Sequence, residues 1–346
     1  MISDSEMIVK SPAVISLFGE HAMAYGKFAL TSAIDLYATC SVKRVSDRNL
    51  WIHLSDYDQV SMPFYPGKLE LLYESYNARR SQNDYVKENE DIDARLLPYA
   101  TVAAKLIFEF NLDIFGKEVF ISSNIPQHSG TSSSAACLTA FAVGLTRSMG
   151  PVTGGVVADA VMMEMAREGE KVAHRYEGVG RLDILASYYG GYVSTMNGGR
   201  HESLSNNLDL VMINTGAKRS APEVAAEIRK LYDTKKTETE NILEEIGKCA
   251  SDGLEALSKG DLQKVGDLMS KTHEFYRGMG VSNDKIEQAI DIAKGCGAFG
   301  AKMEDGGNIV LALSKDSKAL AEAIWKEGYP ASVISVSFNG ASSYLK

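Results

Sequence analysis

Cysteine is scarce in this chain, and the few cysteines are far apart. The 346 residues contain 4 cysteines and no Cys-x-x-Cys pair. A zinc site or a disulfide framework needs closely spaced or paired cysteines, so neither is expected. We predict buried, reduced thiols, and these are Cys40, Cys137, Cys249 and Cys296.

The chain also lacks an excess of positive charge and any long apolar run. It has 36 Lys and Arg against 45 Asp and Glu, a net charge of −9. Non-specific nucleic-acid binding needs a basic face and is therefore not expected. No run of about 18 apolar residues is present, and the first residues have neither a basic nor an apolar segment. We expect a cytoplasmic protein that does not associate with membranes.

Length and local patterning favour two domains that mix helices and strands. Domains usually contain about 100–200 residues, and this chain has 346. A run rich in Gly, Ser and Asn at 198–207 is the expected boundary, which predicts domains at 1–200 and 201–346. The charged segment 73–93 is expected to be an exposed insertion or lid.

Apolar periodicity predicts the individual elements. Strands are expected at 7–9, 14–18, 28–34, 37–42, 119–123, 192–196, 208–213, 309–313 and 332–338. Helices are expected at 94–110, 137–149, 156–175, 286–294 and 318–327, with two or three more within 222–279. Residues 178–183 are expected to form a loop.

A hydroxyl-rich loop precedes one of these helices, and it is the most informative segment of the chain. Residues 126–136 read Pro-Gln-His-Ser-Gly-Thr-Ser-Ser-Ser-Ala-Ala. Loop amides and the free N–H groups of a helix N-terminus together bind phosphate. An ordinary serine-capped helix is the alternative. The candidate phosphate-binding residues are Gly130, Thr131, Ser132, Ser133, Ser134 and Ala135. The loop has no lysine and is not a Walker A motif.

Three segments together resemble the GHMP kinases, the superfamily of galactokinase, homoserine kinase, mevalonate kinase and phosphomevalonate kinase. The first is Gly19-Glu-His-Ala22 followed by Tyr25-Gly26, a pattern most similar to mevalonate kinases. The second is the serine loop. The third is Gly297-Ala-Phe-Gly-Ala-Lys-Met303 with the glycines that follow it. The resemblance covers nearly the whole chain.

This resemblance implies an α+β protein of two domains with the active site between them. The first would be similar to the second domain of ribosomal protein S5, and the second would be a ferredoxin-like α/β sandwich. The implied cofactors are ATP and Mg²⁺. By the same resemblance, Ser134 and Glu170 hold the magnesium ion, with Glu168 the less favoured candidate. Family members are often dimers, which allows a homodimer, although no segment identifies an interface.

The resemblance also places the reaction centre at Asp183, which would orient or deprotonate the acceptor hydroxyl. With an ordinary pKa near 4, orientation would matter more than proton removal. A structural role as a turn or helix cap is the alternative. Mevalonate kinases have a lysine where this chain has Val14, so another cation is needed, and Arg181 and Lys10 are the nearest in sequence.

Four residues are expected to contact the substrate. The resemblance assigns Glu20 and His21 to this role, while a lone histidine is often only structural. Lys218 and Arg219 follow an expected strand, and their charges suit a carboxylate or a phosphate.

The third motif departs from the family pattern, because Lys302 is followed by Met-Glu-Asp-Gly-Gly. The motif is also about two residues shorter than in the family. Two acidic residues, Glu304 and Asp305, would lie near the phosphates, so either magnesium compensates for their charge or this loop is turned away.

These observations lead to one functional hypothesis with several alternatives. We expect an ATP-dependent kinase that phosphorylates the 5-hydroxyl of mevalonate, or of mevalonate 3-phosphate as in the variant archaeal pathway, for isoprenoid biosynthesis. Another GHMP kinase, similar to phosphomevalonate kinase or galactokinase, is one alternative. A non-catalytic relative that binds a nucleotide or metabolite is the other.

Overall fold

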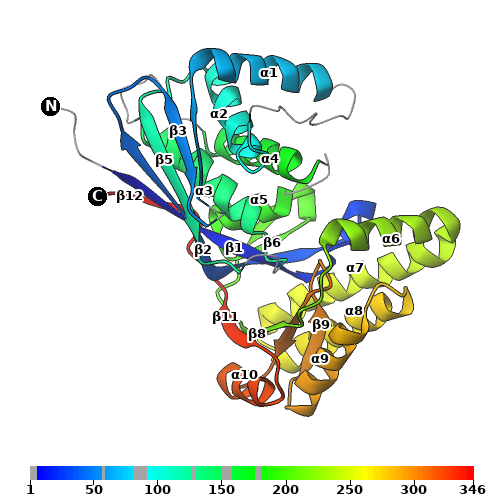
Figure 1. The fold of residues 1–346 in the computed structure, drawn as a ribbon. Helices are drawn as coiled ribbons and strands as arrows, with labels where there is room; N and C mark the ends of the chain where they lie inside the picture. Colours follow the sequence, from blue (N-terminus) through cyan, green and yellow to red (C-terminus); the bar gives the residue numbers. More distant parts are fainter. Residues whose placement is uncertain (1–5, 57–58, 81–91, 127–129, 150–157, 176–180) are drawn as a thin grey trace.

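The chain forms two units of mixed helix and sheet, each built on its own β-sheet (Figure 1). The computed structural model describes residues 6–56, 59–80, 92–126, 130–149, 158–175 and 181–346. The first unit contains β1 (Met7–Phe18), the 3-10 helix η1 (Ala22–Tyr25), β2 (Leu30–Arg44), β3 (Leu50–Leu54), β4 (Val60–Phe64), α1 (Pro66–Arg80), α2 (Leu97–Phe110), β5 (Lys117–Ser123), α3 (Ser133–Arg147), α4 (Asp159–His174), α5 (Arg181–Tyr189), β6 (Tyr192–Ser194), η2 (Met196–Gly198) and β7 (Arg200–Glu202). The remainder contains β8 (Asp209–Asn214), α6 (Ala221–Thr234), α7 (Lys236–Lys259), α8 (Leu262–Gly278), α9 (Asp284–Gly295), β9 (Gly300–Met303), β10 (Ile309–Leu313), α10 (Ser317–Lys326), β11 (Ala331–Ser335) and β12 (Ser342–Leu345).

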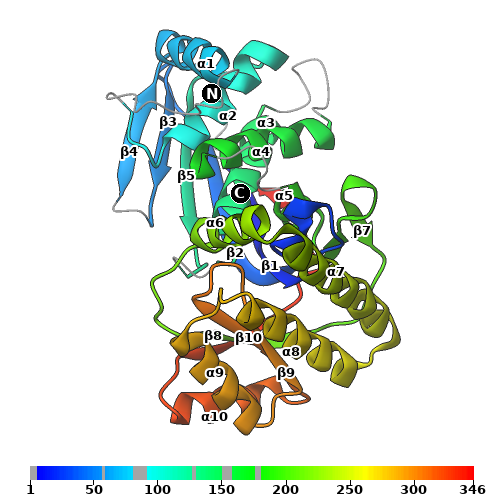
Figure 2. The same cartoon turned by 90° about the vertical axis from the view of Figure 1, so that its right-hand side faces the viewer.

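The first sheet has the strand order β12-β1-β2-β5-β3-β4, and β6 pairs with both β2 and β7. Its pairs are antiparallel except for β3 with β5. Helices α3 and α5 lie against this sheet, and α2 and α4 pack outside α3 (Figures 1 and 2). Strand β1 is buried from Ser11 to Phe18, because α3 and α5 contact it together with α7 and α8 of the second unit. Elements of both units therefore contact β1, and β2 also contacts α7 and β11.

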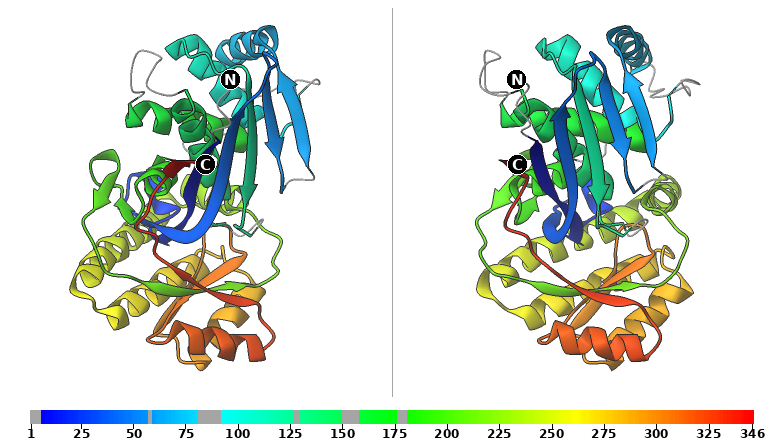
Figure 3. Two further views of the ribbon diagram at one scale, coloured as in Figure 1. Left: turned by 90° about the vertical axis from the view of Figure 1, so that its left-hand side faces the viewer. Right: turned by 60° about the vertical axis from the view of Figure 1, so that its left-hand side comes forward.

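The second sheet is antiparallel, with the order β11-β8-β10-β9. The order of elements along the chain is the ferredoxin-like one: strand β8, helices α6 to α9, the hairpin β9–β10, helix α10 and strand β11. The chain then returns, so that β12 pairs with β1, and the start of β1 lies beside the end of β12 at one edge of the first sheet (Figure 3). The α+β fold expected from the sequence is confirmed, while the boundary at residue 200 stays a prediction.

Three local expectations differ from the structure. Segment 73–93 does not begin as an exposed insertion, because α1 continues to Arg80 and Tyr76 is buried in it; residues 81–91 lie outside the described part. Residues 181–183 belong to α5 and not to a loop. All four cysteines are free, but only three are buried, since Cys296 is half-buried. Among the described helices, none is long and apolar enough to span a membrane.

Candidate active site

The serine loop joins β5 to α3, and its backbone is shaped for close approach by a ligand. Gly130 has φ +71° and Ser132 has φ +46°, both in the left-handed region. No side chain caps the N-terminus of α3, so its first N–H groups remain available. The Val14 amide donates to the Thr131 carbonyl at 3.2 Å, which ties the loop to β1. Residues 127–129 lie outside the described part.

The two expected magnesium ligands lie on neighbouring helices, and His174 lies between them. Ser134 Oγ is 3.2 Å from His174 Nε2, and the same nitrogen is 3.4 Å from Glu170 Oε2. Glu170 is buried, and its Oε1 has no hydrogen-bond partner. A buried carboxylate oxygen without a partner suits a hard cation such as Mg²⁺, and His174 separates this carboxylate from the Ser134 hydroxyl.

Glu168, the less favoured candidate, has a different environment. It is buried, and it accepts a hydrogen bond from Tyr76 Oη at 2.8 Å, pairs with Lys171 and lies 3.2 Å from Lys105 Nζ. Against the effect of burial, the hydrogen bonds from Lys171 and Tyr76 and the charge of Lys105 lower the pKa of Glu168 to about 2. Its charge is already balanced, so it joins α4 to α1 and α2 and is not available to a metal ion.

Asp183 lies in the first turn of α5, partly buried beside the serine loop. Burial, followed by the negative charges of Glu170 and Asp305, raises the pKa of Asp183 to about 7, although a hydrogen bond with Ser132 opposes the shift. A carboxylate with a pKa near neutrality is a better general base than one near 4. Asp183 could therefore accept a proton near neutral pH, and its role at the acceptor hydroxyl stays a prediction.

The second unit reaches this region through the turn between β9 and β10. Glu304 Oε2 lies 2.6 Å from where a Cβ on Gly130 would be, and Glu304 Oε1 accepts from the Ser16 amide at 3.2 Å. Asp305 is close enough to raise the pKa of Asp183. The loop that carries Glu304 and Asp305 is therefore not turned away from the site.

Comparison with known proteins agrees with this geometry. Residues 98–191 match the model of the GHMP kinases N terminal domain, and residues 254–331 match the model of the GHMP kinases C terminal domain. The chain is 30% identical to a mevalonate kinase of Pyrococcus horikoshii over 316 residues, which are 89% of this chain and 88% of the relative. The chain belongs to the GHMP kinase family. It is therefore an ATP-dependent kinase that acts on a hydroxyl group.

Solved structures share the fold of this GHMP kinase at low sequence identity. The mevalonate kinase from Methanococcus jannaschii has a TM-score of 0.74 at 22% identity, with 95% of this chain and 98% of that chain covered. The galactokinase from Lactococcus lactis, solved with galactose, also has a TM-score of 0.74, at 18% identity, with 99% of this chain and 95% of that chain covered. Members with different acceptors thus share this architecture.

The expected substrate residues Glu20 and His21 are buried at the junction of the two units. Lys302 Nζ lies 2.7 Å from Glu20 Oε1. His21 Nε2 lies 3.0 Å from the Asp305 carbonyl oxygen and 3.4 Å from Asp305 Oδ1. Both residues therefore contact the β9–β10 segment of the second unit, and a role toward the substrate stays a prediction.

The position of Val14 is apolar throughout. Val14 is fully buried in a small cluster, whose other buried members are Ala29, Leu182, Ala186 and Val193. Arg181 is exposed at the start of α5, and its Nη2 lies 3.3 Å from where a Cβ on Gly198 would be. Lys10 is exposed on β1. Arg181 is thus the candidate cation on the same helix as Asp183.

The last two predicted substrate residues, Lys218 and Arg219, follow β8 and differ in exposure and in side-chain partners. Lys218 is exposed. Arg219 is partly buried, donates to the Val281 carbonyl at 2.6 Å and pairs with Glu227. Lys218 is therefore the more available of the two for an anionic substrate.

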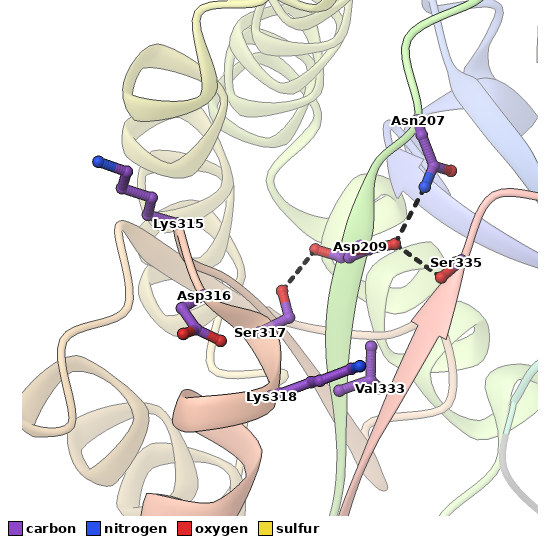
Figure 4. Close-up of a pocket in the computed structure, with 8 residues that line it drawn as sticks. All are labelled: Asn207, Asp209, Lys315, Asp316, Ser317, Lys318, Val333 and Ser335. Carbon is purple, nitrogen blue, oxygen red and sulfur yellow. Dashed lines mark hydrogen bonds between the residues drawn. The ribbon is translucent and has the colours of Figure 1, made fainter.

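A separate cavity of about 700 Å³ lies on the second unit, between β8, β11 and the start of α10 (Figure 4). Asp209 accepts hydrogen bonds from Ser335 Oγ at 2.6 Å and, through its carbonyl, from Ser317 Oγ at 2.9 Å. None of the predicted site residues lines this cavity.

Within the described ranges, no cluster of three or more His, Cys, Asp or Glu side chains converges as a metal site. A cation held by Ser134 and Glu170 would therefore need further ligands from the nucleotide phosphates.

Proposed function

We propose that this GHMP kinase transfers the γ-phosphoryl group of ATP to the 5-hydroxyl of mevalonate or of mevalonate 3-phosphate. The observation that supports it most directly is Asp183, which has a pKa near 7 and a hydrogen bond with Ser132 of the serine loop. A proton acceptor next to a phosphate-binding loop is what transfer to an alcohol requires. The relative named mevalonate kinase at 30% identity supports the choice of acceptor.

The residues of the serine loop, Gly130 to Ala135, would hold the nucleotide phosphates through backbone N–H groups and hydroxyls. Ser134 and Glu170 would hold Mg²⁺, which when bound neutralises charge on the phosphates. Asp183 accepts the proton of the acceptor hydroxyl as the oxygen attacks phosphorus. The acceptor would be contacted by Glu20, His21 and Lys218. Arg219, the residue after Lys218, would add a second positive charge.

The two acceptors differ in the charge that the site must balance. Val14 contributes no charge where mevalonate kinases have a lysine, and its surroundings are apolar. The exposed Arg181 lies two positions before Asp183. Side chains at this spacing leave a helix on different faces, so the long Arg181 side chain would have to reach around α5 to act on the transferring phosphoryl group or on an additional phosphate of the acceptor. The second role would favour mevalonate 3-phosphate.

An acceptor panel tests this proposal. ADP release from ATP is measured with mevalonate, mevalonate 3-phosphate, mevalonate 5-phosphate and galactose, and ³¹P NMR identifies the phosphorylated position of the product. We expect turnover with one of the first two acceptors and a new phosphate on the 5-oxygen. Turnover confined to either of the last two would replace the proposed acceptor, and ATP binding without any turnover would favour the non-catalytic alternative.

A second experiment tests Arg181. Unchanged kinetics in Arg181→Met would show that its charge acts neither on the transferring phosphoryl group nor on a phosphate of the acceptor.

A further inference from the structure

Two acidic side chains and one lysine are buried together where the two units meet. Lys302 is fully buried; its Nζ donates to the Ser16 carbonyl at 2.9 Å and lies 2.7 Å from Glu20 Oε1. Glu304 is 1% exposed, and its Oε1 accepts a hydrogen bond from the Ser16 amide at 3.2 Å. The second unit thus holds one residue of β1 through both its N–H and its C=O.

The second carboxyl oxygen of Glu304 has no such partner. Glu304 Oε2 is buried and makes no hydrogen bond. It lies against Gly130 of the serine loop, at 2.6 Å from where a Cβ would be. A buried polar atom without a partner is costly, and this one is directed at the loop that binds phosphate in our proposed function.

The local charge balance decides the state of this carboxyl. Lys302 is the cation that faces Glu304, and it already pairs with Glu20. The other charged groups near Glu304 are both acidic: Asp305 in the same turn and Glu20 in the segment after β1. His21 contacts the Asp305 carbonyl oxygen. Among the residues that the structure describes, a charged Glu304 would therefore be a buried carboxylate without a cation of its own, next to the proposed site of the nucleotide phosphates.

We propose that Glu304 is a nucleotide-binding residue whose Oε2 carries a proton and donates it in a hydrogen bond to a phosphate oxygen of the bound nucleotide. A neutral carboxyl has one O–H donor, and phosphate oxygens are acceptors. Burial, with the charge of Asp305 added and that of Lys302 opposed, raises the pKa of Glu304 well above its ordinary value. Nucleotide binding is then coupled to retention of this proton. The inference rests on the proposed nucleotide site.

Titration calorimetry with ADP tests the inference on the full chain. ADP affinity and proton uptake are measured between about pH 6 and 9, in buffers of different ionisation enthalpy, for the wild type and for Glu304→Gln. Above the pKa of the carboxyl, the wild-type Kd should rise by about tenfold per pH unit, with uptake of one proton per ADP. Glutamine keeps the shape and a donor but does not ionise, so its Kd should show a clearly weaker pH dependence than the wild type. Glu322→Gln, an exposed glutamate of α10, is the matched control.

The outcomes separate this inference from the proposed function. If the wild type binds no ADP at any pH, the nucleotide site itself is wrong. If ADP binds but its Kd at about pH 6 is the same for the wild type and for Glu304→Ala, which removes the donor, only the role of Glu304 is wrong. Should Glu304→Gln fail to fold, as judged by circular dichroism, Glu304→Ala decides by the same comparison.

Discussion

His174 Nε2 lies 3.4 Å from Glu170 Oε2, one helical turn away on α4, and also reaches Ser134. The hydrogen bond with Glu170 raises the pKa of His174 above its ordinary value. The histidine thus holds the two proposed magnesium ligands in one place, and the other carboxyl oxygen of Glu170 remains without a partner.

Replacing Glu170 with glutamine should weaken the dependence of this kinase on magnesium. The amide keeps the shape of the side chain but removes the charge that attracts the cation. We expect the Mg²⁺ concentration for half-maximal activity to rise by about 10–100-fold, the range known for residues that support a metal. Glu164→Gln, on the exposed face of the same helix, should leave it unchanged, and a similar shift in both variants would contradict the assignment.

Asp183 should determine the acid limb of the pH profile. Since its pKa is raised to about 7, and the base must be unprotonated, kcat/KM should rise with pH up to about 7 and then level off. Asp183→Asn should reduce kcat by about 10²–10⁴-fold and still bind ADP. The control is Asp284→Asn, in the first turn of α9. A wild-type profile that is flat between about pH 5 and 8 would rule out a general base with this pKa.

The same carboxyl should lower stability at alkaline pH. Its pKa is higher in the folded chain, about 7, than the ordinary 3.8, so folding costs free energy once the group is charged in both states. The cost is absent below about pH 4 and complete above about pH 7. Asp183→Asn should therefore have a higher Tm than the wild type at alkaline pH but not at about pH 4, as measured by calorimetry. A lower Tm at both pH values would show that the carboxylate stabilises the fold.

Gly130→Ala should weaken nucleotide binding because the new Cβ would displace the Glu304 carboxyl from the serine loop. The new Cβ would meet Glu304 Oε2 at 2.6 Å, in addition to the strain of a left-handed φ of +71°. Gly260→Ala has nearly the same φ, +69°, with nothing within 4 Å. Both variants should lose about 1 kcal/mol of stability from backbone strain. Only Gly130→Ala should lose about tenfold or more in ADP affinity by calorimetry; equal affinities would contradict the close packing.

Lys105→Met should destabilise the first unit by leaving Glu168 with fewer partners. Lys105 is 3% exposed and lies 3.2 Å from Glu168, and removing one member of a buried pair costs about 3–5 kcal/mol. Lys259→Met, which breaks an exposed pair with Glu255, should leave the stability nearly unchanged. Urea denaturation measures both, and equal losses would show that the buried pair is unimportant.

The pH dependence of Glu168 has the opposite sign to that of Asp183. Its pKa falls from the ordinary 4.5 to about 2 on folding. The stability that it contributes is therefore present above about pH 4.5 and is lost as the pH falls towards 2. Lys105→Met should reduce this contribution.

Much of the site could be predicted from short stretches of the chain. The order strand, serine loop and helix around Gly130 follows from local preferences, because glycine takes a left-handed φ and serines favour helix starts. The choice of Glu170 over Glu168 came from a family pattern and stays a prediction; the structure adds that Glu168 is already paired with lysines. The helix at Arg181 was missed, because only a few apolar residues lie before the glycines.

What the sequence by itself determined is the set of elements and the reactive groups that each carries. Periodicity and turn chemistry act between neighbouring residues, so α3, α4 and most of the second unit could be predicted from these local patterns. Strand β1 was predicted as two short strands, at 7–9 and 14–18, and is one continuous strand, Met7–Phe18. Only the tertiary structure decided that Glu304 faces Gly130, that Lys302 holds Ser16, and that Asp183 has a pKa near 7. Burial and charge pairing depend on contacts between residues far apart in the chain, and these exist only once the two units meet at β1.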